Sequence, residues 1–300
     1  MKHIKNISAS VRQQLLKQSR QDKRPFSELL QYYAMERFLF RLSNSIHAKQ
    51  FILKGAYLLK IWKVSEFRGT MDIDLLGRAS NELTTIINQI QEILEVDVAD
   101  DGISFYSDSI QVERIAEDAD YHGVRVRFIG ILDTAKIYMQ IDIGFDDVIH
   151  PSPKLLELPV LLDFPVPRLL CYSRESVIAE KFQAIVKLGA INSRMKDFYD
   201  IWHLCRQFNF EGQKLANAIR LTFQKRGTSI STKIYAFEES FIVDKQKLWS
   251  AFCNRLAQEH LPESFEEIIL VIKTFLVPII TKLSQNESIS LSWQACGPWV

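Results

Sequence analysis

The chain has 300 residues, 47% of them hydrophobic and 24% charged, which is typical of a globular protein and excludes a disordered or collagen-like chain. The formal net charge of +1 gives no overall attraction to nucleic acid or to a membrane surface, so binding to a polyanion would depend on a local basic patch. The cysteines lie far apart without a CxxC pair, which favours reduced thiols over a disulfide framework or a zinc site.

Two segments bear on export and membrane binding. The N-terminal stretch MKHIKNISASVRQQLL lacks the apolar core of a signal peptide. The most apolar later stretch, IILVIKTFLVPII, is too short to span a bilayer and contains Lys273 and Pro278, so we interpret it as a buried helix. We therefore expect a cytoplasmic protein with no membrane partner.

The first 45 residues predict two helices. Ser8 and Ser10 are candidate N-caps of the first, and a second helix with an apolar stripe follows Pro25. A basic run before the second helix has only Asp22 as an opposing acid, and it indicates either a contact surface for an RNA backbone or a solvated helix face. The run consists of Lys2, Lys5, Arg12, Lys17, Arg20, Lys23 and Arg24.

Residues 51–145 predict strands mixed with helices. A short apolar run at 51–53 is interpreted as a strand that ends at Lys54-Gly55, and a helical pattern occupies 56–63. A second apolar run, MDIDLL at 71–76, is followed by an amphipathic helix at 82–95. The segments GVRVRFIGIL (123–132) and AKIYMQIDIGF (135–145) alternate with period two and predict two further strands.

The remainder of the chain predicts a connection and then helices. Prolines crowd residues 151–167, which indicates a connection rather than a regular element, and the pattern after about residue 170 is helical nearly to the end. The sequence therefore predicts an α+β fold with a mixed β-sheet flanked by helices, followed by a mainly helical part. We assign residues 1–165 to the N-terminal helices and the α/β domain, and residues 166–300 to the helical domain.

Two carboxylates lie close together in the 71–76 segment. Residues i and i+2 of a strand point to the same face, so Asp72 and Asp74 would project together while Ile73 enters the core. Parallel carboxylates repel each other unless a cation lies between them, and Mg²⁺ prefers such oxygen ligands. A solvated strand end is the alternative interpretation. Asp142 is a candidate third acid, which would converge with the others if its strand pairs beside theirs.

Three further residues extend this hypothesis. Gly55, between a strand and a helix, would let backbone N–H groups approach a phosphate. In SRESVIAEKFQAIVKLG, Ser173 is a candidate N-cap and Lys181 lies inside an apolar stripe, where an unpaired lysine is rare. In SRMKDFYDIWHLC, Asp197 lies on the inward face. A Lys181–Asp197 pair would suit triphosphate binding, and a structural salt bridge between packed helices is the other interpretation.

Other kinds of catalytic site have no support in the sequence. The histidines show no HxxxH or HExxH spacing, so we expect no zinc site, and His203 is interpreted as a core residue. The GxSxG and GxxxxGK[ST] motifs are both absent, which argues against serine nucleophiles and P-loop chemistry.

The order of the segments resembles a known family. Lys54-Gly55-Ala56 is followed by the stretch RGTMDID at 68–74, then by YMQIDIGFDD, SVIAEKFQAIVKL and RMKDFYDIWHL. This pattern resembles the AbiEii/AbiGii nucleotidyltransferase toxin family of the DNA-polymerase-β-like nucleotidyltransferase superfamily. The resemblance extends from the helix FSELLQYYAMERFLFRL to the C-terminal CGPW.

The resemblance implies a nucleotidyltransferase fold and the toxin of a toxin–antitoxin pair linked to abortive phage infection. Such a protein would use a nucleoside triphosphate and two Mg²⁺ ions, release pyrophosphate, and add nucleotides to an RNA acceptor such as the tRNA 3′ end, with a cognate antitoxin encoded nearby. By position, Asp72 and Asp74 match the metal-binding acids, and Asp142, Lys181 and Asp197 complete the catalytic set. The residues expected to contact substrate are Lys54, Gly55, Ala56, Arg68, Thr70, Lys196 and Asp200.

One position departs from the family pattern, which usually has Gly-Gly or Gly-Ser where this chain has Gly55-Ala56. Alanine permits close approach of a phosphate but supplies no hydroxyl, so triphosphate affinity or nucleotide choice is affected. Two other functions stay open, namely nucleotidyl transfer to a small molecule or protein, and a non-catalytic interaction protein with the same fold. The preferred base, the acceptor and the antitoxin are not predicted.

Overall fold

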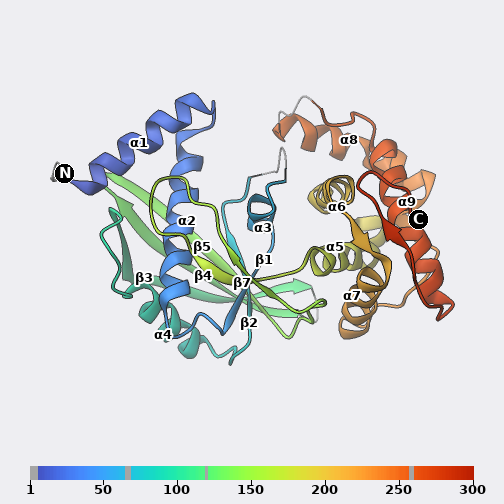
Figure 1. Ribbon diagram of the computed structural model, residues 1–300, viewed down its shortest axis with the longest axis horizontal. Coiled ribbons are helices and arrows are strands. Elements are labelled where there is room, and N and C mark those ends of the chain that lie inside the picture. Colours follow the sequence, from blue (N-terminus) through green and yellow to red (C-terminus); the bar gives the residue numbers. More distant parts are fainter. Residues whose placement is uncertain (1–5, 65–68, 119–120, 257–259) are drawn as a thin grey trace. The chain divides into compact units, whose positions relative to one another are not determined.

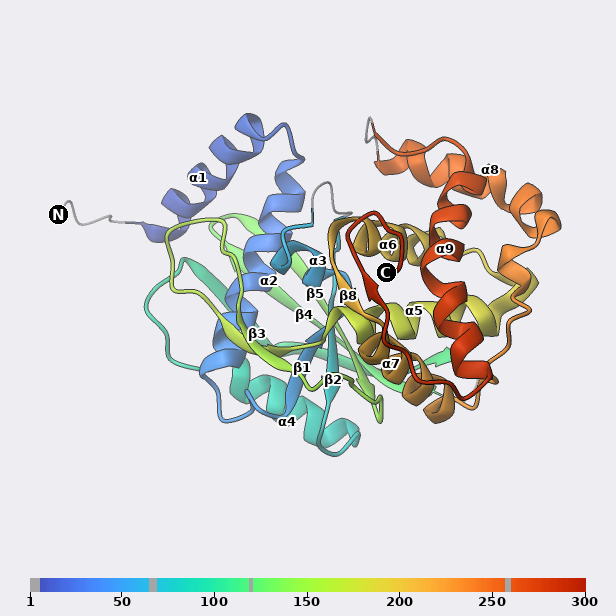
Figure 2. The ribbon, with the colours of Figure 1, turned by 45° about the vertical axis from the view of Figure 1, so that its right-hand side comes forward.

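The computed structural model describes residues 6–64, 69–118, 121–256 and 260–300. The chain divides into two compact units (Figures 1 and 2). Unit 1 takes the described residues within Met1–Lys63, Gly69–Asp146 and Lys154–Cys171, and unit 2 takes those within Val64–Arg68, Asp147–Pro153 and Tyr172–Val300. The predicted fold class, a mixed sheet flanked by helices and then a mainly helical part, is confirmed.

In the described part of unit 1, seven strands form a mixed sheet in the spatial order β3-β4-β5-β2-β1-β7-β6. Strands β3, β4 and β5 are antiparallel neighbours, whereas β2 runs parallel to β5 and antiparallel to β1, and β1 runs parallel to β7. The strands are β1 (Phe51–Lys54), β2 (Ile73–Gly77), β3 (Ile103–Asp118), β4 (Tyr121–Leu132), β5 (Ala135–Phe145), β6 (Lys154–Glu157) and β7 (Arg168–Cys171).

Strand β6 lies inside the proline-rich segment, so the interpretation of 151–167 as a connection without regular structure is wrong there. It pairs with β7 in antiparallel register and lies at the edge of the sheet. An edge strand tolerates neighbouring prolines, because fewer of its N–H groups need a partner strand.

In the part of unit 1 that the structure describes, four helices surround this sheet: α1 (Ile7–Gln21), α2 (Phe26–Asn44), α3 (Tyr57–Ile61) and α4 (Leu83–Leu94). The first helix begins at Ile7, before both predicted caps. Asn6 is the N-cap, and its side chain accepts a hydrogen bond from the Ala9 N–H at 2.9 Å, so the assignment of Ser8 or Ser10 is wrong. The second helix begins directly after Pro25, as predicted.

The core of unit 1 lies between α2 and one face of the sheet (Figure 1). The alternating apolar residues of β5 are all buried, namely Ile137, Met139, Ile141 and Ile143. Phe38 of α2 packs against Phe128 of β4 with ring centroids 5.6 Å apart. Because strand side chains alternate, Arg125 lies on the opposite face from Phe128. The polar face of β4 and β5, which carries Arg125 and Asp142, therefore faces away from α2.

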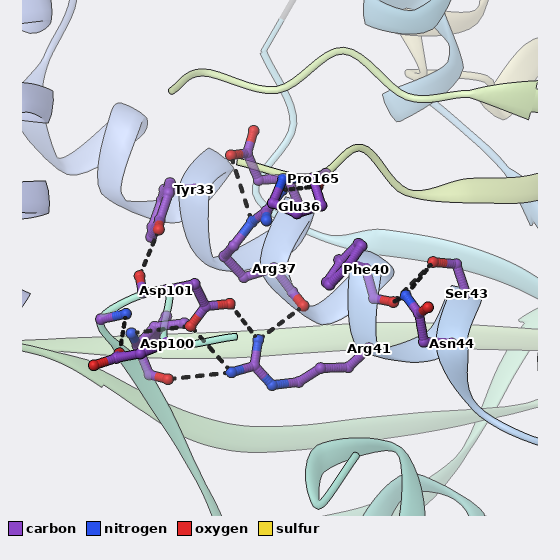
Figure 3. Close-up of polar contacts among 12 residues, drawn as sticks. Tyr33, Glu36, Arg37, Phe40, Arg41, Ser43, Asn44, Asp100, Asp101 and Pro165 are labelled. Atoms are coloured by element: carbon purple, nitrogen blue, oxygen red, sulfur yellow. Dashed lines mark hydrogen bonds and ion pairs between the residues drawn. The ribbon is translucent and has the colours of Figure 1, made fainter. Parts of the chain in front are cut away.

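A buried ion pair ties α2 to the segment between α4 and β3 (Figure 3). Arg41 donates two hydrogen bonds to the Asp101 carboxylate, Nη1 to Oδ2 at 2.7 Å and Nη2 to Oδ1 at 3.1 Å. The Tyr33 hydroxyl donates to the main-chain oxygen of Asp101 at 2.6 Å, and burial raises the pKa of Tyr33, so the hydroxyl keeps its proton. These bonds fix α2 against the sheet, which matters because the same helix also holds the segment before β2.

Unit 2 is mainly helical and contains α5 (Arg174–Leu188), α6 (Met195–Gln207), α7 (Gly212–Lys225), α8 (Glu239–Leu256) and α9 (Phe265–Ser284), with the short helices η1 (Gly189–Ile191) and η2 (Tyr235–Phe237). Helix α5 packs on α6 and α7, while α9 packs on α6, α7 and α8 (Figure 2). Ser173 caps α5 as predicted, since its hydroxyl accepts the Ser176 N–H at 3.1 Å.

The C-terminal segment folds back onto α9. Strands β8 (Phe210–Glu211) and β9 (Ser292–Trp293) pair, and the Trp299 ring stacks on Phe275 with centroids 5.5 Å apart. The apolar stretch IILVIKTFLVPII forms part of α9 and is largely buried, as predicted. Across the described ranges, no helix combines the length and apolarity needed to cross a membrane. The cysteines, which all lie in those ranges, are free.

Candidate active site

A row of charged side chains crosses the unit 1 sheet on the face opposite to α2. Lys54 on β1 lies opposite Asp74 on β2, and Asp74 is the register partner of Asp142 on β5. Asp142 in turn lies opposite Arg125 on β4. Register partners in neighbouring strands point to the same face, so these side chains form one line. The predicted pairing of the Asp142 strand beside the Asp74 strand is confirmed.

Gly55 gives the Asp74 carboxylate room. The glycine directly follows β1 with φ +72°, and a Cβ added there would lie 1.8 Å from Oδ2 of Asp74. Two features therefore require glycine at this position: the left-handed backbone conformation and the close approach of the Asp74 carboxylate. The next residue, Ala56, has helical dihedral angles, is buried, and is the N-cap of α3. The close neighbour of Gly55 in this structure is Asp74.

Asp72 lies immediately before β2, where α2 holds the chain. The Thr70 hydroxyl donates a hydrogen bond to Oδ1 of Asp72, and the Thr70 N–H donates to the Tyr32 hydroxyl at 3.0 Å. The ammonium of Lys60 lies 4.9 Å from the centroid of the Tyr32 ring, which adds a cation–π contact to this anchor. The expected site residue Thr70 thus links Asp72 to the buried surface of α2.

Gln31 of α2 holds the next residue of the same segment. Its Nε2 donates to the main-chain oxygen of Met71 at 3.0 Å and to that of Tyr138 on β5 at 3.1 Å. The side chain is buried, and its two hydrogen bonds give the main-chain oxygens of Met71 and Tyr138 a donor where water has little access. Gln31 was not predicted as a site residue, although a polar residue inside the apolar stripe of a helix was a visible signal.

Asp142 is held by Arg125, which was also not predicted as a site residue. Nε of Arg125 donates to Oδ1 of Asp142 and Nη2 donates to Oδ2, both at 2.7 Å. Asp142 is only 7% exposed. The hydrogen bonds to Asp142 are the largest cause that raises the pKa of Arg125, and the charges of Glu113 and Asp72 act in the same direction. The third acid of the row therefore has a fixed counter-ion.

The carboxylates of Asp72 and Asp74 fit a divalent metal by the chemistry of their donors. Both side chains are partly exposed, and Mg²⁺ is usually bound by one or two carboxylates, with water or phosphate oxygens in the other positions. Among the residues that the structure describes, no three His, Cys, Asp or Glu side chains are arranged to hold a metal ion. The arrangement fits an open site with two carboxylates and does not fit a closed cage.

In unit 2, Lys181 on α5 lies between two acids of α6. Its Nζ is 3.0 Å from Oδ1 of Asp197 and 2.7 Å from Oδ2 of Asp200. The two carboxylates are 0% exposed and Lys181 is 13% exposed. Arg194 places its Nε 2.8 Å from the second oxygen of Asp197. Because two buried carboxylates repel each other, the positive charge of Lys181 between them offsets this repulsion.

The other predicted residues of unit 2 lie outside this cluster or outside the residues that the structure describes. Lys196 is exposed in the first turn of α6, and Arg68 lies outside the described residues. His203 is a buried core residue, as predicted, and its ring centroid is 4.6 Å from that of Tyr199. Burial lowers the pKa of His203 to about 4, so the imidazole is neutral near pH 7.

Two residues of the basic run near the N-terminus contact other side chains of unit 1. Arg24 lies 2.7 Å from Glu28 and covers the Tyr32 ring at 5.4 Å, and Arg12 lies 5.7 Å from the centroid of the Phe26 ring. Lys17, Arg20 and Lys23 are exposed, whereas Lys2 and Lys5 lie outside the described residues.

A buried pair supports α3, the helix that follows Gly55. Oε2 of Glu36 on α2 accepts the Leu161 N–H at 2.9 Å and lies 3.9 Å from Nζ of Lys60 on α3. Burial raises the pKa of Glu36 to about 7, although the positive charge of Lys60 opposes this shift. Burial also lowers the pKa of Lys60. This pair was not predicted from the sequence.

Comparison with known proteins gives a family match and several similar structures, two of which come from Helicobacter pylori. The family model described as "Nucleotidyl transferase AbiEii toxin, Type IV TA system" matches residues 37–270, a shorter range than the predicted resemblance. The fold is similar to JHP933 from Helicobacter pylori, at 15% identity over 83% of this chain and 90% of that chain, with TM-score 0.43. A second solved structure from H. pylori, described with a provisional nucleotidyltransferase assignment, gives 15% identity over 84% of this chain and 94% of that chain, with TM-score 0.45. No curated protein matches.

Proposed function

Because the chain belongs to the AbiEii nucleotidyl transferase toxin family of type IV toxin–antitoxin systems, we propose that it transfers a nucleotide from a nucleoside triphosphate to an RNA acceptor such as the tRNA 3′ end. An acceptor hydroxyl would bond to the α-phosphorus, the α–β phosphoanhydride bond would break, and pyrophosphate would leave. We propose that the protein works in the cytoplasm and is countered by a cognate antitoxin encoded nearby.

One observation carries this proposal: two partly exposed carboxylates are fixed at the start of a central strand. The Thr70 hydroxyl binds Asp72, and the main chain at Gly55 packs against Asp74. These are the residues that would hold Mg²⁺, with two ions when the triphosphate is bound. Bound Mg²⁺ supplies positive charge to the triphosphate oxygens and to the leaving pyrophosphate.

The remaining residues have roles that their surroundings support. Asp142 or Asp197 orients the acceptor hydroxyl or accepts its proton, and Lys181 neutralises charge that develops on the phosphates. Asp197 and Asp200 hold the Lys181 ammonium in one position before substrate arrives, which reduces the entropy lost on binding. The residues proposed to contact substrate are Lys54, Gly55, Ala56, Arg68, Thr70, Lys196 and Asp200.

The test is incubation of the protein with Mg²⁺, total RNA and each labelled nucleoside triphosphate in turn. We expect label in RNA with the wild type and with Asp108→Asn, which removes an exposed carboxylate of β3 and serves as the matched control. The Asp72→Asn and Asp74→Asn variants should lose the transfer. Absence of label from RNA with a folded wild type would contradict the proposal.

The same experiment separates the alternative functions. Label on protein or on a small molecule, with RNA unlabelled, would replace RNA as the acceptor while keeping the reaction. Toxicity in cells that survives both Asp72→Ala and Asp74→Ala would indicate a non-catalytic interaction protein. Circular dichroism spectra of the variants must match that of the wild type, which checks that a lost activity is not a lost fold.

A further inference from the structure

A cavity of about 230 Å³ lies in unit 1 beside α2, the helix that packs on the face of the sheet opposite to the row of charged side chains. Helix α2 contributes Arg37, Phe40 and Asn44, which are three and four residues apart and therefore share one face of the helix (Figure 3). The other walls come from the segment between α4 and β3 and from the connection between β6 and β7. The candidate active site uses none of these residues.

A buried guanidinium lines the cavity and has a donor to spare. Arg37 is 0% exposed, and its Nη2 donates to the main-chain oxygen of Pro165 at 3.1 Å. Its Nε makes no hydrogen bond within the described residues, and the Glu36 carboxylate, at 3.7 Å, is too far away for one. A buried donor without a partner costs free energy, which a ligand with an acceptor at this place would recover.

Two aromatic rings give the cavity flat apolar walls. The guanidinium of Arg37 lies 5.3 Å from the centroid of the Phe40 ring and 5.5 Å from that of the Phe164 ring. Such rings stack on planar heterocycles as well as on guanidinium groups. Drug-sized ligands fill pockets of roughly 300–1,000 Å³. A cavity of about 230 Å³ therefore fits a smaller planar molecule.

The exposed side of the cavity carries acceptors and negative charge. The amide nitrogen of Asn44 donates to the main-chain oxygen of Phe40 at 2.8 Å and to the Ser43 hydroxyl at 3.2 Å, which leaves its Oδ1 as an acceptor. Asp97 adds an exposed carboxylate. A ligand therefore needs N–H donors on this side. A phosphate or carboxylate group is disfavoured, because Asp97 at the opening and Glu36 beside Arg37 are acids.

The wall opposite α2 is fixed before any ligand arrives. Arg41 binds both carboxylate oxygens of Asp101, and the Tyr33 hydroxyl binds the main-chain oxygen of the same residue (Figure 3). The Asp101 carboxylate is thus already occupied, so it shapes the cavity and does not compete for the ligand. A wall held in this way lowers the entropy that binding would cost.

We propose that this cavity binds the base of a 6-oxopurine nucleoside, such as guanosine or inosine. Arg37 donates to the acceptors O6 and N7 of the base, and Phe40 and Phe164 stack on its ring. Asp97 and the Asn44 amide oxygen accept the N1 hydrogen and, in guanosine, the 2-amino group. Adenosine has an amino group in place of O6, so it would set a donor against the donors of the guanidinium. The proposal does not depend on the proposed nucleotidyl transfer.

The test is isothermal titration calorimetry of the full-length protein with guanosine, inosine and adenosine, in EDTA so that no metal-dependent site contributes. Guanosine should bind at one site, inosine about 10-fold more weakly because it lacks the 2-amino group, and adenosine at least about 100-fold more weakly. Asp97→Asn should lower the affinity for guanosine more than that for inosine. Asp163→Asn changes an exposed acid outside the cavity and should alter neither affinity.

Two further substitutions locate the binding. Ala99→Trp fills the cavity from an exposed residue of its wall and should abolish guanosine binding, whereas Ala79→Trp, at an exposed position outside the cavity, should not. Arg37→Gln removes the guanidinium and should weaken guanosine binding at least about 10-fold. Melting curves check that each variant is folded. If the buried Arg37→Gln variant does not fold, Ala99→Trp and Asp97→Asn still decide.

Several outcomes would overturn the proposal. A folded wild type that binds no guanosine contradicts it, and so does guanosine binding that survives in Ala99→Trp. Equal affinity for adenosine contradicts the assignment of the base. Phenylalanine bound in place of guanosine would mean that the cavity takes a zwitterionic amino acid. Guanosine 5′-monophosphate should bind more weakly than guanosine, and tighter binding that Ala99→Trp abolishes would show that the acids do not exclude phosphate.

Discussion

The Cβ that Gly55 lacks would lie 1.8 Å from Oδ2 of Asp74, far inside the distance at which non-bonded atoms meet. Gly55→Ala should therefore displace the Asp74 carboxylate and also strain a left-handed backbone. We expect a loss of about 3 kcal/mol in the free energy of unfolding, from strain and overpacking together. Mn²⁺ affinity should fall at least about 10-fold. Urea unfolding and Mn²⁺ titration measure the two effects.

Gly227→Ala is the matched control for Gly55→Ala. Gly227 has φ +58°, and a Cβ added there meets no atom within 4 Å. This variant carries the backbone strain without the clash, so it should lose about 1 kcal/mol and keep the Mn²⁺ affinity of the wild type. Equal losses in the two variants would show that strain, and not the contact with Asp74, makes Gly55 necessary.

The local parts of the fold could be predicted because they depend on short patterns. The inward position of Ile141 and the outward position of Asp142 follow from alternation in one strand, and the cap at Ser173 follows from one side chain at a helix start. The edge strand β6 was missed because its residues, Lys154–Glu157, carry no alternation and lie among prolines.

The Arg125–Asp142 pair was missed because it depends on register. Strands β4 and β5 are joined by a two-residue turn, which pairs Leu132 with Ala135. Counting seven residues back and seven forward from that pair brings Arg125 opposite Asp142, so the turn length contained the signal. The contacts of Gln31 cannot be found by counting from a turn, because its acceptors, Met71 and Tyr138, come from two distant segments.

Glu36 should make the protein less stable as pH rises. Its pKa is about 7 in the folded protein against an ordinary value of 4.5, so the protonated carboxyl is favoured on folding. This contribution to stability is fully present below pH 4.5 and is lost as pH rises through 7, with an upper limit of about 3 kcal/mol. Urea unfolding of the wild type and of Glu36→Gln at pH 5 and pH 8 isolates this loss, because the other groups that titrate in this range contribute equally to both proteins.

Glu36→Gln should remove that pH dependence, since glutamine keeps an oxygen for the Leu161 N–H and has no charge. Glu95→Gln, which changes an exposed residue at the end of α4, should retain the wild-type dependence of the unfolding free energy on pH. A Glu36→Gln variant that loses as much stability between pH 5 and pH 8 as the wild type would disprove the assignment.

His203 should act in the opposite direction. Burial lowers its pKa from 6.5 to about 4, so the neutral ring is favoured on folding. The stabilisation is present above pH 6.5 and is lost as pH falls towards 4, by up to about 3 kcal/mol. His203→Phe keeps an aromatic ring against Tyr199 and should flatten this loss, while His260→Phe, at an exposed position, should not. Thermal unfolding at pH 4.5 and pH 7 provides the comparison.

Lys181→Met should be strongly destabilising whatever its effect on catalysis. It leaves the buried carboxylates of Asp197 and Asp200 without the ammonium that lies within 3.0 Å of both. Removal of one partner from a buried ion pair usually costs 3–5 kcal/mol, and we expect a loss of about 3 kcal/mol because Lys181 is partly exposed. Lys196→Met, on the exposed side of the same helix pair, should leave the unfolding free energy unchanged.

A second substitution separates the structural role of Lys181 from its proposed role on phosphate. Lys181→Met/Asp200→Asn removes one of the two opposing carboxylates, so it should recover about half of the lost stability. If nucleotidyl transfer stays absent in this more stable double variant, the ammonium itself is needed for the reaction. Transfer that returns with stability would mean that Lys181 serves only to hold α5 against α6, and its proposed contact with the triphosphate would have to be abandoned.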